Sequence, residues 1–431
     1  MALISEAEWE QVALEVLAEQ GWQPTTGAEI AGERSSLSEI VLTGRVQAAA
    51  RRLNPAVPEV YLRQAVTEIL TPASTDAISE ARRLHQVLVE GYRGVSWIDH
   101  DGVEQNPTIR LIGPQVADND WLAVHQLKIA DAEHHRRFDL VGFVNGLPVL
   151  IAELKQAGLA HATLSAAHAQ LGTYLAEFPL AFRACAITVI SDGATASYGT
   201  PFTPLHHYAS WNVDEDGEPV ADGESIDDTD YDTQLEITFN GLGNPQRFLD
   251  LFTNFTAFDA SEAGLAMRVA KPHQYFAVRK AVGRTIHAAS SNGKAGVVWH
   301  TQGSGKSMEM ELYANLILRD QHLLNPTVVV ITDRRELDGQ LYQGFARSTL
   351  LPEQPVQVIT RSQLRTALPQ RSSGGLLFTT LQKFNRTLEE RQSGLDHPLL
   401  SERHNIVVIV DEAHRSHYDD LDGYAKFLRD A

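Results

Sequence analysis

The segment RRFDLVGFVNGLPVLIAELKQA, Arg136–Ala157, decides the fold of the N-terminal half of the chain. It contains two apolar runs separated by Asn145-Gly146, a dipeptide that strongly favours a two-residue β-hairpin turn. Charged residues stand near the outer ends, Asp139 on the first run and Glu153 and Lys155 on the second. The segment therefore predicts a hairpin of two strands that brings three charged groups to its open end.

Charged side chains inside an apolar strand are costly unless they are paired or used. Glu153 and Lys155 are two residues apart, so they share one face of their strand. Two carboxylates on one face can hold Mg²⁺, and a lysine beside them can steady the charge that develops during phosphodiester cleavage. Solvated strand ends are the alternative, because a Glu-x-Lys pattern alone is common.

The turn and this chemistry predict registers that differ by one residue. A two-residue turn followed by a regular ladder pairs Val144 with Leu147 and Asp139 with Ala152, which puts Glu153 on the other face of the sheet. A shared metal site requires Asp139 opposite Glu153, and therefore a longer loop or a β-bulge. We predict the register that brings the two carboxylates together.

The remainder of the N-terminal half predicts helices and then short strands. A capping box, Ser5 to Glu8, precedes an amphipathic segment, and further helices are expected at 37–53, 61–70 and 78–92. Strands follow from about residue 96, and a helix at 160–177 carries Gln170 and Tyr174 on one face. An upstream carboxylate such as Glu68 is a candidate for completing the metal site. The pattern predicts an α+β domain around a sheet.

The C-terminal half alternates strands and helices regularly. Apolar runs at 295–300, 327–332 and 406–410 predict strands, and the segments 269–289 and 307–319 predict helices. Near-continuous Val and Ile strands favour a parallel sheet that is covered on both faces. Residues 241–260 suggest a linker, so we expect domains at 1–255 and 256–431.

The segment GVVWHTQGSGKSMEM, 296–310, places a glycine-rich turn before a helix. The backbone N–H groups of such a turn can cradle phosphates, and the helix N-terminus favours negative charge. Lys306 would contact the β- and γ-phosphates of ATP, and Ser307 would hold Mg²⁺. The full pattern has glycine where this chain has His300. The predicted phosphate-binding residues are Gly303, Ser304, Gly305, Lys306 and Ser307.

A second element of a nucleotide site is IVVIVDEAH, 406–414, an apolar run that ends in two carboxylates. Asp411 would bind the Mg²⁺ through water, and Glu412 would polarise the attacking water. A helix-capping role is the alternative for an isolated Asp-Glu pair, but its position about a hundred residues after a phosphate loop favours catalysis.

Composition narrows the class of protein. Cys185 is the only cysteine, which excludes a disulfide framework and indicates a reducing compartment. The net charge of −19 argues against DNA binding. However, ten of the acidic residues lie between 214 and 232, a segment without Lys or Arg, so much of the negative charge is confined to one segment. No apolar run is long enough to span a bilayer. We expect a cytoplasmic protein with no membrane partner.

The motifs resemble two known families. GSGKS, DEAH and TDRRELDGQ are similar to motifs I, II and Ia of superfamily 2 helicases and translocases, and D-x13-E-x-K followed by Q-x-x-x-Y resembles the RecB-like branch of the PD-(D/E)xK nucleases. The resemblance implies a nuclease domain followed by an incomplete RecA-like motor domain. It implies that Gln274 binds adenine, that Gln170 and Tyr174 support the nuclease, and that Thr332, Arg334 and Arg335 touch the DNA backbone.

This combination resembles the R (restriction) subunit of type I restriction enzymes. The resemblance implies ATP-dependent translocation on double-stranded DNA, cleavage far from the recognition site, and assembly with methyltransferase (M) and specificity (S) subunits, with two R subunits per complex. S-adenosylmethionine would belong to the partner subunits. A helicase-nuclease of DNA repair, a single-chain restriction enzyme and a non-catalytic DNA-binding module are the alternatives. Since no second RecA-like domain is evident, we expect this piece to bind ATP weakly and to hydrolyse it poorly.

Overall fold

The computed structural model describes residues 5–156, 163–220, 233–261, 264–332, 335–395, 397–411, 428 and 431. The chain divides into two compact units. Unit 1 comprises residues 1–258 and 262–272, and unit 2 comprises residues 259–261 and 273–431. No helix in the described ranges is both long and apolar enough to cross a lipid bilayer.

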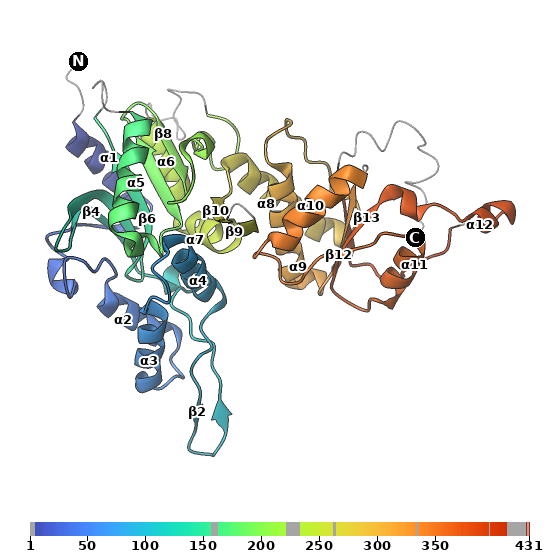
Figure 1. Cartoon of the computed structure of the whole chain (residues 1–431), viewed down its shortest axis with the longest axis horizontal. Coiled ribbons are helices and arrows are strands. Elements are labelled where there is room, and N and C mark those ends of the chain that lie inside the picture. Colours follow the sequence, from blue (N-terminus) through green and yellow to red (C-terminus); the bar gives the residue numbers. More distant parts are fainter. Residues whose placement is uncertain are drawn as a thin grey trace. The chain divides into compact units, whose positions relative to one another are not determined.

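Unit 1 is built around a six-stranded mixed sheet in the order β1-β4-β5-β6-β7-β8 (Figure 1). The β1–β4 and β6–β7 pairs are parallel and the other three are antiparallel. Every residue of β6 is buried, so both faces of the sheet are covered at its centre. The strands are β1 (Gln23–Thr26), β4 (Trp121–Ala130), β5 (His135–Val144), β6 (Leu147–Leu154), β7 (Ile187–Ser191) and β8 (Ala196–Gly199).

Seven α-helices are described in unit 1, and the capping box predicted at Ser5 does begin the first of them. The helix expected at 37–53 begins only at Thr43, because Leu42 donates its backbone N–H to the Gly146 carbonyl and is fully buried there. The helices are α1 (Glu6–Glu19), α2 (Thr43–Leu53), α3 (Glu59–Leu70), α4 (Ala77–Glu90), α5 (Leu164–Glu177), α6 (Gln234–Gly243) and α7 (Pro245–Asn254).

The prediction of a linker at 241–260 is wrong. Asn244 caps α7 through its side chain, and Pro245 occupies the first turn, where a missing N–H does no harm. Phe248, Leu251 and Phe252 are buried along one side of this helix. The Trp22 indole donates to the Gly243 carbonyl at 2.7 Å, which fixes the junction of α6 and α7 against the sheet. The segment is therefore part of the core of unit 1.

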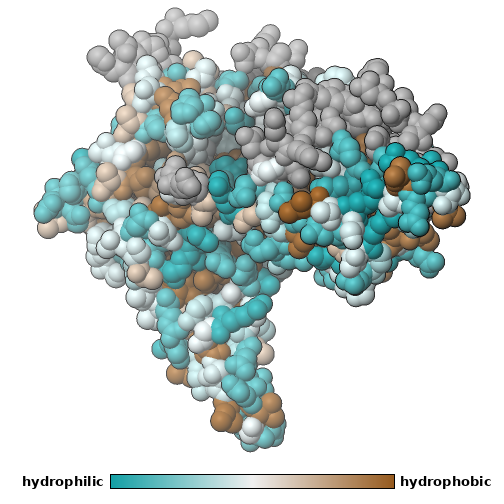
Figure 2. Space-filling view, turned by 45° about the vertical axis from the view of Figure 1, so that its right-hand side comes forward, coloured by the Kyte–Doolittle hydropathy of each residue, from teal (hydrophilic) through white to brown (hydrophobic). Residues whose placement is uncertain are grey.

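The structure also contains two short two-stranded sheets, of which the β2–β3 pair is antiparallel. β2 (Trp97–Ile98) pairs with β3 (Glu104–Gln105), and β9 (Thr256–Ser261) pairs with β10 (Gly264–Val269). The β2–β3 arm projects from the unit (Figure 1), and Ile98 and Val103 on it are exposed. Figure 2 shows brown and teal patches side by side on the projecting part of the surface.

Unit 2 contains the predicted parallel sheet, with four strands in the order β12-β13-β11-β14. Val329, Ile331, Leu364, Leu377 and Phe384 form the centre of its core. The strands are β11 (Thr327–Thr332), β12 (Val356–Gln357), β13 (Leu376–Thr380) and β14 (Ile406–Val410). The helices are α8 (Pro272–Ala289), α9 (Lys306–Arg319), α10 (Arg335–Arg347), α11 (Arg361–Gln370) and α12 (Leu388–Gln392).

The strand predicted at 295–300 does not form. The segment is extended but belongs to no sheet, and Val297 and Trp299 are 84% and 87% exposed. A strand needs a neighbour that satisfies its backbone N–H and C=O groups, and none of the strands in the described part of the chain pairs with this segment. Apolar composition alone was a misleading signal here.

Candidate active site

The turn between β5 and β6 has two residues, as Asn145-Gly146 predicts. Asn145 and Gly146 adopt φ values of +52° and +81°, and Val144 pairs with Leu147. The Asn145 side chain is fully buried and satisfied on both sides. Its amide donates to the Leu111 carbonyl and Asn119 Oδ1, and its oxygen accepts from Asp120 N and Arg52 Nη2, all four at 2.8 Å.

A β-bulge two residues into the hairpin then shifts the register. Phe143 pairs with Pro148 but Gly142 pairs with Leu150, so that Val149 is the extra residue. The ladder continues as far as Leu140 with Ala152. One further step in the same register puts Asp139 opposite Glu153, and the N–H of the following residue, Leu154, donates to Asp139 Oδ2. The hairpin thus has the turn predicted by Asn-Gly and the register predicted from the two carboxylates. A Cβ on Gly142 would lie 2.9 Å from the Trp22 ring, which explains glycine at the bulge.

Asp139 and Glu153 form a buried acidic pair beside Lys155. Their exposures are 3% and 0%, and the Lys155 ammonium forms an ion pair with Glu153 Oε1. Asp139 Oδ2 accepts from the Leu154 N–H at 2.8 Å. Glu153 Oε2 is buried without a hydrogen-bond partner among the described residues. The pair therefore holds a buried acceptor oxygen that none of the described residues satisfies.

The pKa values of this group follow from its burial. Desolvation raises the pKa of Asp139 to about 6. Desolvation and the nearby Asp139 charge raise the pKa of Glu153 to about 8. Burial disfavours the Lys155 ammonium, but the charges of Glu153 and Asp139 together raise its pKa above the ordinary value. A divalent cation would relieve the repulsion and return both carboxyls to their charged form.

Helix α1 contributes two carboxylates that sequence reasoning missed. One oxygen each of Glu6, Glu10 and Asp139 lies within 4.8 Å of the others. The Glu10 carboxylate is buried and accepts a hydrogen bond of 3.1 Å from the amide of Gln126, a residue in β4 with an unusual φ of +55°. The signal in the sequence was the i, i+4 spacing of the two glutamates, which puts both on one helix face. Glu68 is instead exposed and accepts from the Tyr92 hydroxyl.

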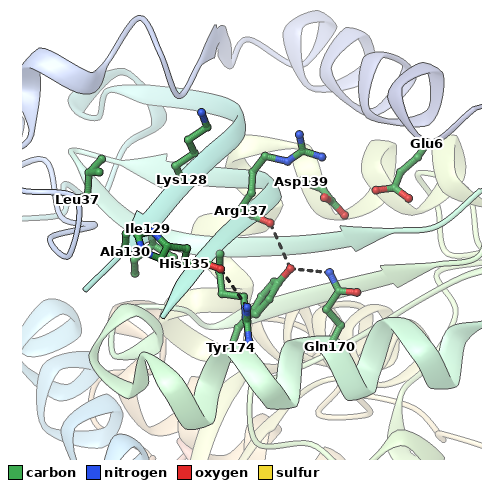
Figure 3. Close-up of a pocket in the computed structure, with 11 residues that line it drawn as sticks. Glu6, Leu37, Lys128, Ile129, Ala130, His135, Arg137, Asp139, Gln170 and Tyr174 are labelled. Carbon is green, nitrogen blue, oxygen red and sulfur yellow. Dashed lines mark hydrogen bonds between the residues drawn. The ribbon is translucent and has the colours of Figure 1, made fainter. Parts of the chain in front are cut away.

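Gln170 and Tyr174 lie on α5, beside the same strand ends (Figure 3). The Gln170 amide donates to the Tyr174 hydroxyl at 2.5 Å, and that hydroxyl donates to the Arg137 carbonyl at 3.3 Å. The Tyr174 ring packs edge-on against Phe138. Burial, then the Glu153 charge, raise the pKa of Tyr174 to about 12, so it remains a neutral donor. Phe138 and Asp139 point to opposite faces, so α5 and α1 cover opposite sides of the sheet.

A cavity of about 460 Å³ opens onto this group, with Glu6, Asp139, Gln170 and Tyr174 in its wall. The oxygens of Glu6, Glu10 and Asp139 lie close enough together to share one ion, and Glu153 lies beside Asp139. Carboxylate oxygens suit a hard cation such as Mg²⁺ better than a transition metal. The unsatisfied Glu153 oxygen is the observation that fits such an ion.

The glycine-rich loop of unit 2 has the backbone that a phosphate cradle requires. Gly303 and Gly305 adopt φ values of +85° and +92°, and α9 begins directly afterwards at Lys306. The buried Gln274 amide donates to the Ser304 carbonyl at 3.1 Å, and a Cβ on Gly305 would lie 2.4 Å from its nitrogen. Gln274, predicted to bind adenine, is therefore held against the loop. The Lys306 ammonium donates to backbone carbonyls of the same loop, and Ser307 is exposed at the start of α9.

His300, which replaces the first glycine of the pattern, has a partner of its own. Its Nδ1 lies 2.7 Å from the buried carboxylate of Glu309, one turn into α9. His273 Nε2 lies 3.0 Å from the Ser304 carbonyl. These contacts tie both ends of the loop to its flanking helices, and sequence reasoning did not foresee them.

The other predicted residues are only partly described. Asp411 follows β14, half-buried, and its N–H donates to the Ile331 carbonyl at 2.9 Å. Thr332 is buried at the end of β11. Glu412 and Arg334 lie outside the described residues, as does the side chain of Arg335 at the start of α10.

Comparison with known proteins finds a matching family model for part of each unit. Residues 3–207 match the family model of the type I restriction enzyme R protein N terminus, and residues 273–431 match that of the SWI2/SNF2 ATPase. The HindI type I restriction enzyme endonuclease subunit of Haemophilus influenzae is 36% identical over 100% of this chain and 41% of its own length. The putative type I restriction enzyme MjaIXP endonuclease subunit of Methanocaldococcus jannaschii is 28% identical over 96% and 40%.

A third relative, the type I restriction enzyme SsaAORF53P endonuclease subunit of Staphylococcus saprophyticus, is 25% identical over 70% of this chain and 30% of that subunit. The chain spans about two fifths of the length of the first two relatives. The predicted resemblance to the R subunit of type I restriction enzymes is thus confirmed by similarity along the whole chain. The chain belongs to the type I restriction enzyme R protein family, whose N-terminal region its residues 3–207 match.

Proposed function

We propose that this chain is the nuclease and ATP-binding part of an R subunit that moves double-stranded DNA with ATP and cleaves it with Mg²⁺ away from the recognition site. The observation that carries the proposal is the bulged hairpin, which brings Asp139 and Glu153 together beside Lys155 despite a two-residue turn. A register shift that brings buried like charges together lowers the stability of the fold. Such an arrangement is therefore expected where the charges have a function, such as binding a metal ion.

In this proposal Asp139 and Glu153 hold the metal ion directly, and Glu6 and Glu10 complete its oxygen shell. Bound Mg²⁺ would supply charge stabilisation to the pentavalent phosphate and acidify its water. Lys155, already paired with Glu153, would stabilise negative charge next to the nucleophile. Tyr174 and Gln170 would fix the end of β5 through the Arg137 carbonyl, so that Asp139 keeps its position.

In unit 2 the loop from Gly303 to Ser307 would hold the phosphates of ATP, and Gln274 would bind adenine. Asp411 would hold the nucleotide's Mg²⁺ and Glu412 would polarise the attacking water, while Arg334 and Arg335 would touch DNA. The match of residues 273–431 to an SWI2/SNF2 ATPase supports a motor role.

The partners proposed are double-stranded DNA and the M and S subunits, with two R subunits per complex and S-adenosylmethionine bound only by the partners. The names of the relatives, all endonuclease subunits of type I enzymes, favour this over a repair helicase-nuclease or a single-chain enzyme. A cytoplasmic location is part of the same proposal.

Two variants in the assembled enzyme test the proposal. Asp139→Asn should abolish cleavage of circular DNA that carries the recognition site, while ATP hydrolysis continues. Lys306→Ala should abolish ATP hydrolysis, and with it cleavage. If the enzyme with Asp139→Asn still cut DNA at the normal rate, the nuclease site would be wrongly assigned.

A further inference from the structure

The surface beside the acidic group carries two cations, Lys128 and Arg137, whose side chains take part in no hydrogen bond or ion pair with the described residues. Lys128 of β4 and Arg137 of β5 are exposed and directly opposite each other in the antiparallel ladder. Within the described ranges, neither side chain has a hydrogen bond or an ion pair. Like charges directly opposite each other destabilise a sheet, so the fold gains nothing from this arrangement.

The pair lies on the face that carries the candidate metal site. Arg137 and Asp139 are two residues apart on β5, so their side chains leave the strand on the same side. Figure 3 shows Lys128, Arg137, Asp139 and Glu6 on one side of the strands, with α5 on the other. All four line the same cavity. Two residues of strand span about 7 Å, so the cations stand one or two phosphates away from the metal site.

The backbone under the pair is held from both sides. The Lys128 carbonyl accepts from Arg34 Nη1 at 2.6 Å, and the Arg137 carbonyl accepts from the Tyr174 hydroxyl at 3.3 Å. Arg34 also donates to the carbonyls of Leu37 and Glu39. These contacts fix the strand ends, so the two cationic side chains project from a rigid base.

We propose that Lys128 and Arg137 form a phosphate clamp that holds double-stranded DNA by the backbone next to the scissile phosphate. The clamp rests on the proposed nuclease function, because it assigns the substrate-binding part of that same site. The carboxylates of Glu6, Glu10 and Asp139 repel a DNA strand in a chain whose net charge is −19. An adjacent pair of free cations offsets that repulsion locally and sets where the strand lies.

The test measures DNA binding separately from cleavage. The 431-residue chain with Asp139→Asn is titrated with a fluorescein-labelled 20-base-pair duplex of arbitrary sequence, in EDTA, from 50 to 200 mM salt. Adding K128A/R137A should weaken binding about tenfold and make the slope of log K against log salt shallower by about 1.8, since each lost phosphate contact contributes about 0.9. K128R/R137K should keep the parental slope, because charge is retained.

Arg82→Ala provides the matched control, since Arg82 is an exposed cation on α4 of the same unit. The single variants K128M and R137M should each reduce the slope by about 0.9. A double variant that binds with the same affinity and slope as Arg82→Ala would overturn the clamp, as would a parent chain without salt-dependent binding. Cleavage by the assembled enzyme that carries Asp139→Asn would refute the nuclease site but not the clamp. The binding titration tests the clamp alone, so failure of one proposal can be distinguished from failure of the other.

Discussion

The carboxyl groups of Asp139 and Glu153 should make the stability of the metal-free protein fall as pH rises. They titrate near 3.8 and 4.5 when unperturbed but near 6 and 8 in the folded chain. The folded chain therefore keeps protons that the unfolded chain has released. The stabilisation is fully present below pH about 4 and is lost as pH rises through 6 and 8.

Urea denaturation in EDTA between pH 5 and 8.5 measures this loss. The variant D139N/E153Q cannot titrate at these positions, so its stability should change less over the same range, and wild type should regain stability at pH 8 when Mn²⁺ is added. Equal pH slopes for wild type and the double variant would show that the two carboxyls are not protonated in the folded protein.

His300 gives a second prediction at the scale of single residues. His300→Ala leaves the buried Glu309 carboxylate without its 2.7 Å partner, so unit 2 should lose about 1–3 kcal/mol of stability. Because His300→Ala and Glu309→Ala remove the same contact, the double variant should lose less than the sum of the two. Thermal unfolding measures each change, and the exposed His322→Ala is the control. Strict additivity would contradict the pairing.

At the scale of elements, the hairpin shows what local sequence specifies and what it does not. Asn145-Gly146 predicts a two-residue turn, whereas a metal site shared by Asp139 and Glu153 requires a register shifted by one residue. Both features occur, because the bulge at Val149 lies between the turn and the two carboxylates. The bulge was not predictable from β5 and β6 alone, since the close approach of Trp22, more than a hundred residues earlier, fills the space beside Gly142. The register that puts Asp139 opposite Glu153 was predicted from the requirement that both carboxylates bind one metal ion, and not from the turn preference of Asn-Gly.

The errors elsewhere have the same origin. The apolar pattern of residues 295–300 predicts a strand, but whether a strand forms depends on a neighbour that the segment itself does not encode. The composition of residues 241–260 predicts a linker, but Phe248 packs against Trp22 from another part of the chain. Glu6 and Glu10 were missed because their meeting with Asp139 depends on how α1 packs on the sheet. Local motifs were predictable, and long-range packing was not.

The Asn145 turn should be a main determinant of the stability of unit 1. Asn145→Gly keeps the positive φ but loses four buried hydrogen bonds, and should lower the free energy of unfolding by about 2–4 kcal/mol. Asn145→Ala also strains the backbone, and should lose about 1 kcal/mol more. Chemical denaturation measures the free energy of unfolding of the parent chain and of the two variants, which should fall in the order parent, Asn145→Gly, Asn145→Ala. Unchanged midpoints in both variants would mean that other contacts set the turn.

At the scale of the whole molecule, two units with different ligand chemistry should respond to different ligands. The residues proposed to hold the metal ion of the nuclease site all lie in unit 1, whereas the glycine-rich loop, Gln274 and Asp411, which would hold ATP and its Mg²⁺, lie in unit 2. A ligand that binds only the folded state stabilises it by about 2.7 kcal/mol at a hundred times its dissociation constant. Calorimetry of the full chain should therefore separate the effect of a divalent cation from that of a nucleotide.

The last prediction is that these two effects can be removed one at a time. Mn²⁺ without nucleotide should raise the melting temperature of one transition, and D139N/E153Q should abolish that shift. A non-hydrolysable ATP analogue with Mg²⁺ should raise another transition beyond Mg²⁺ alone, and Lys306→Ala should abolish that second shift only. If D139N/E153Q also removed the nucleotide effect, the two sites would be coupled within this chain, and the assignment of one ligand to each unit would fail.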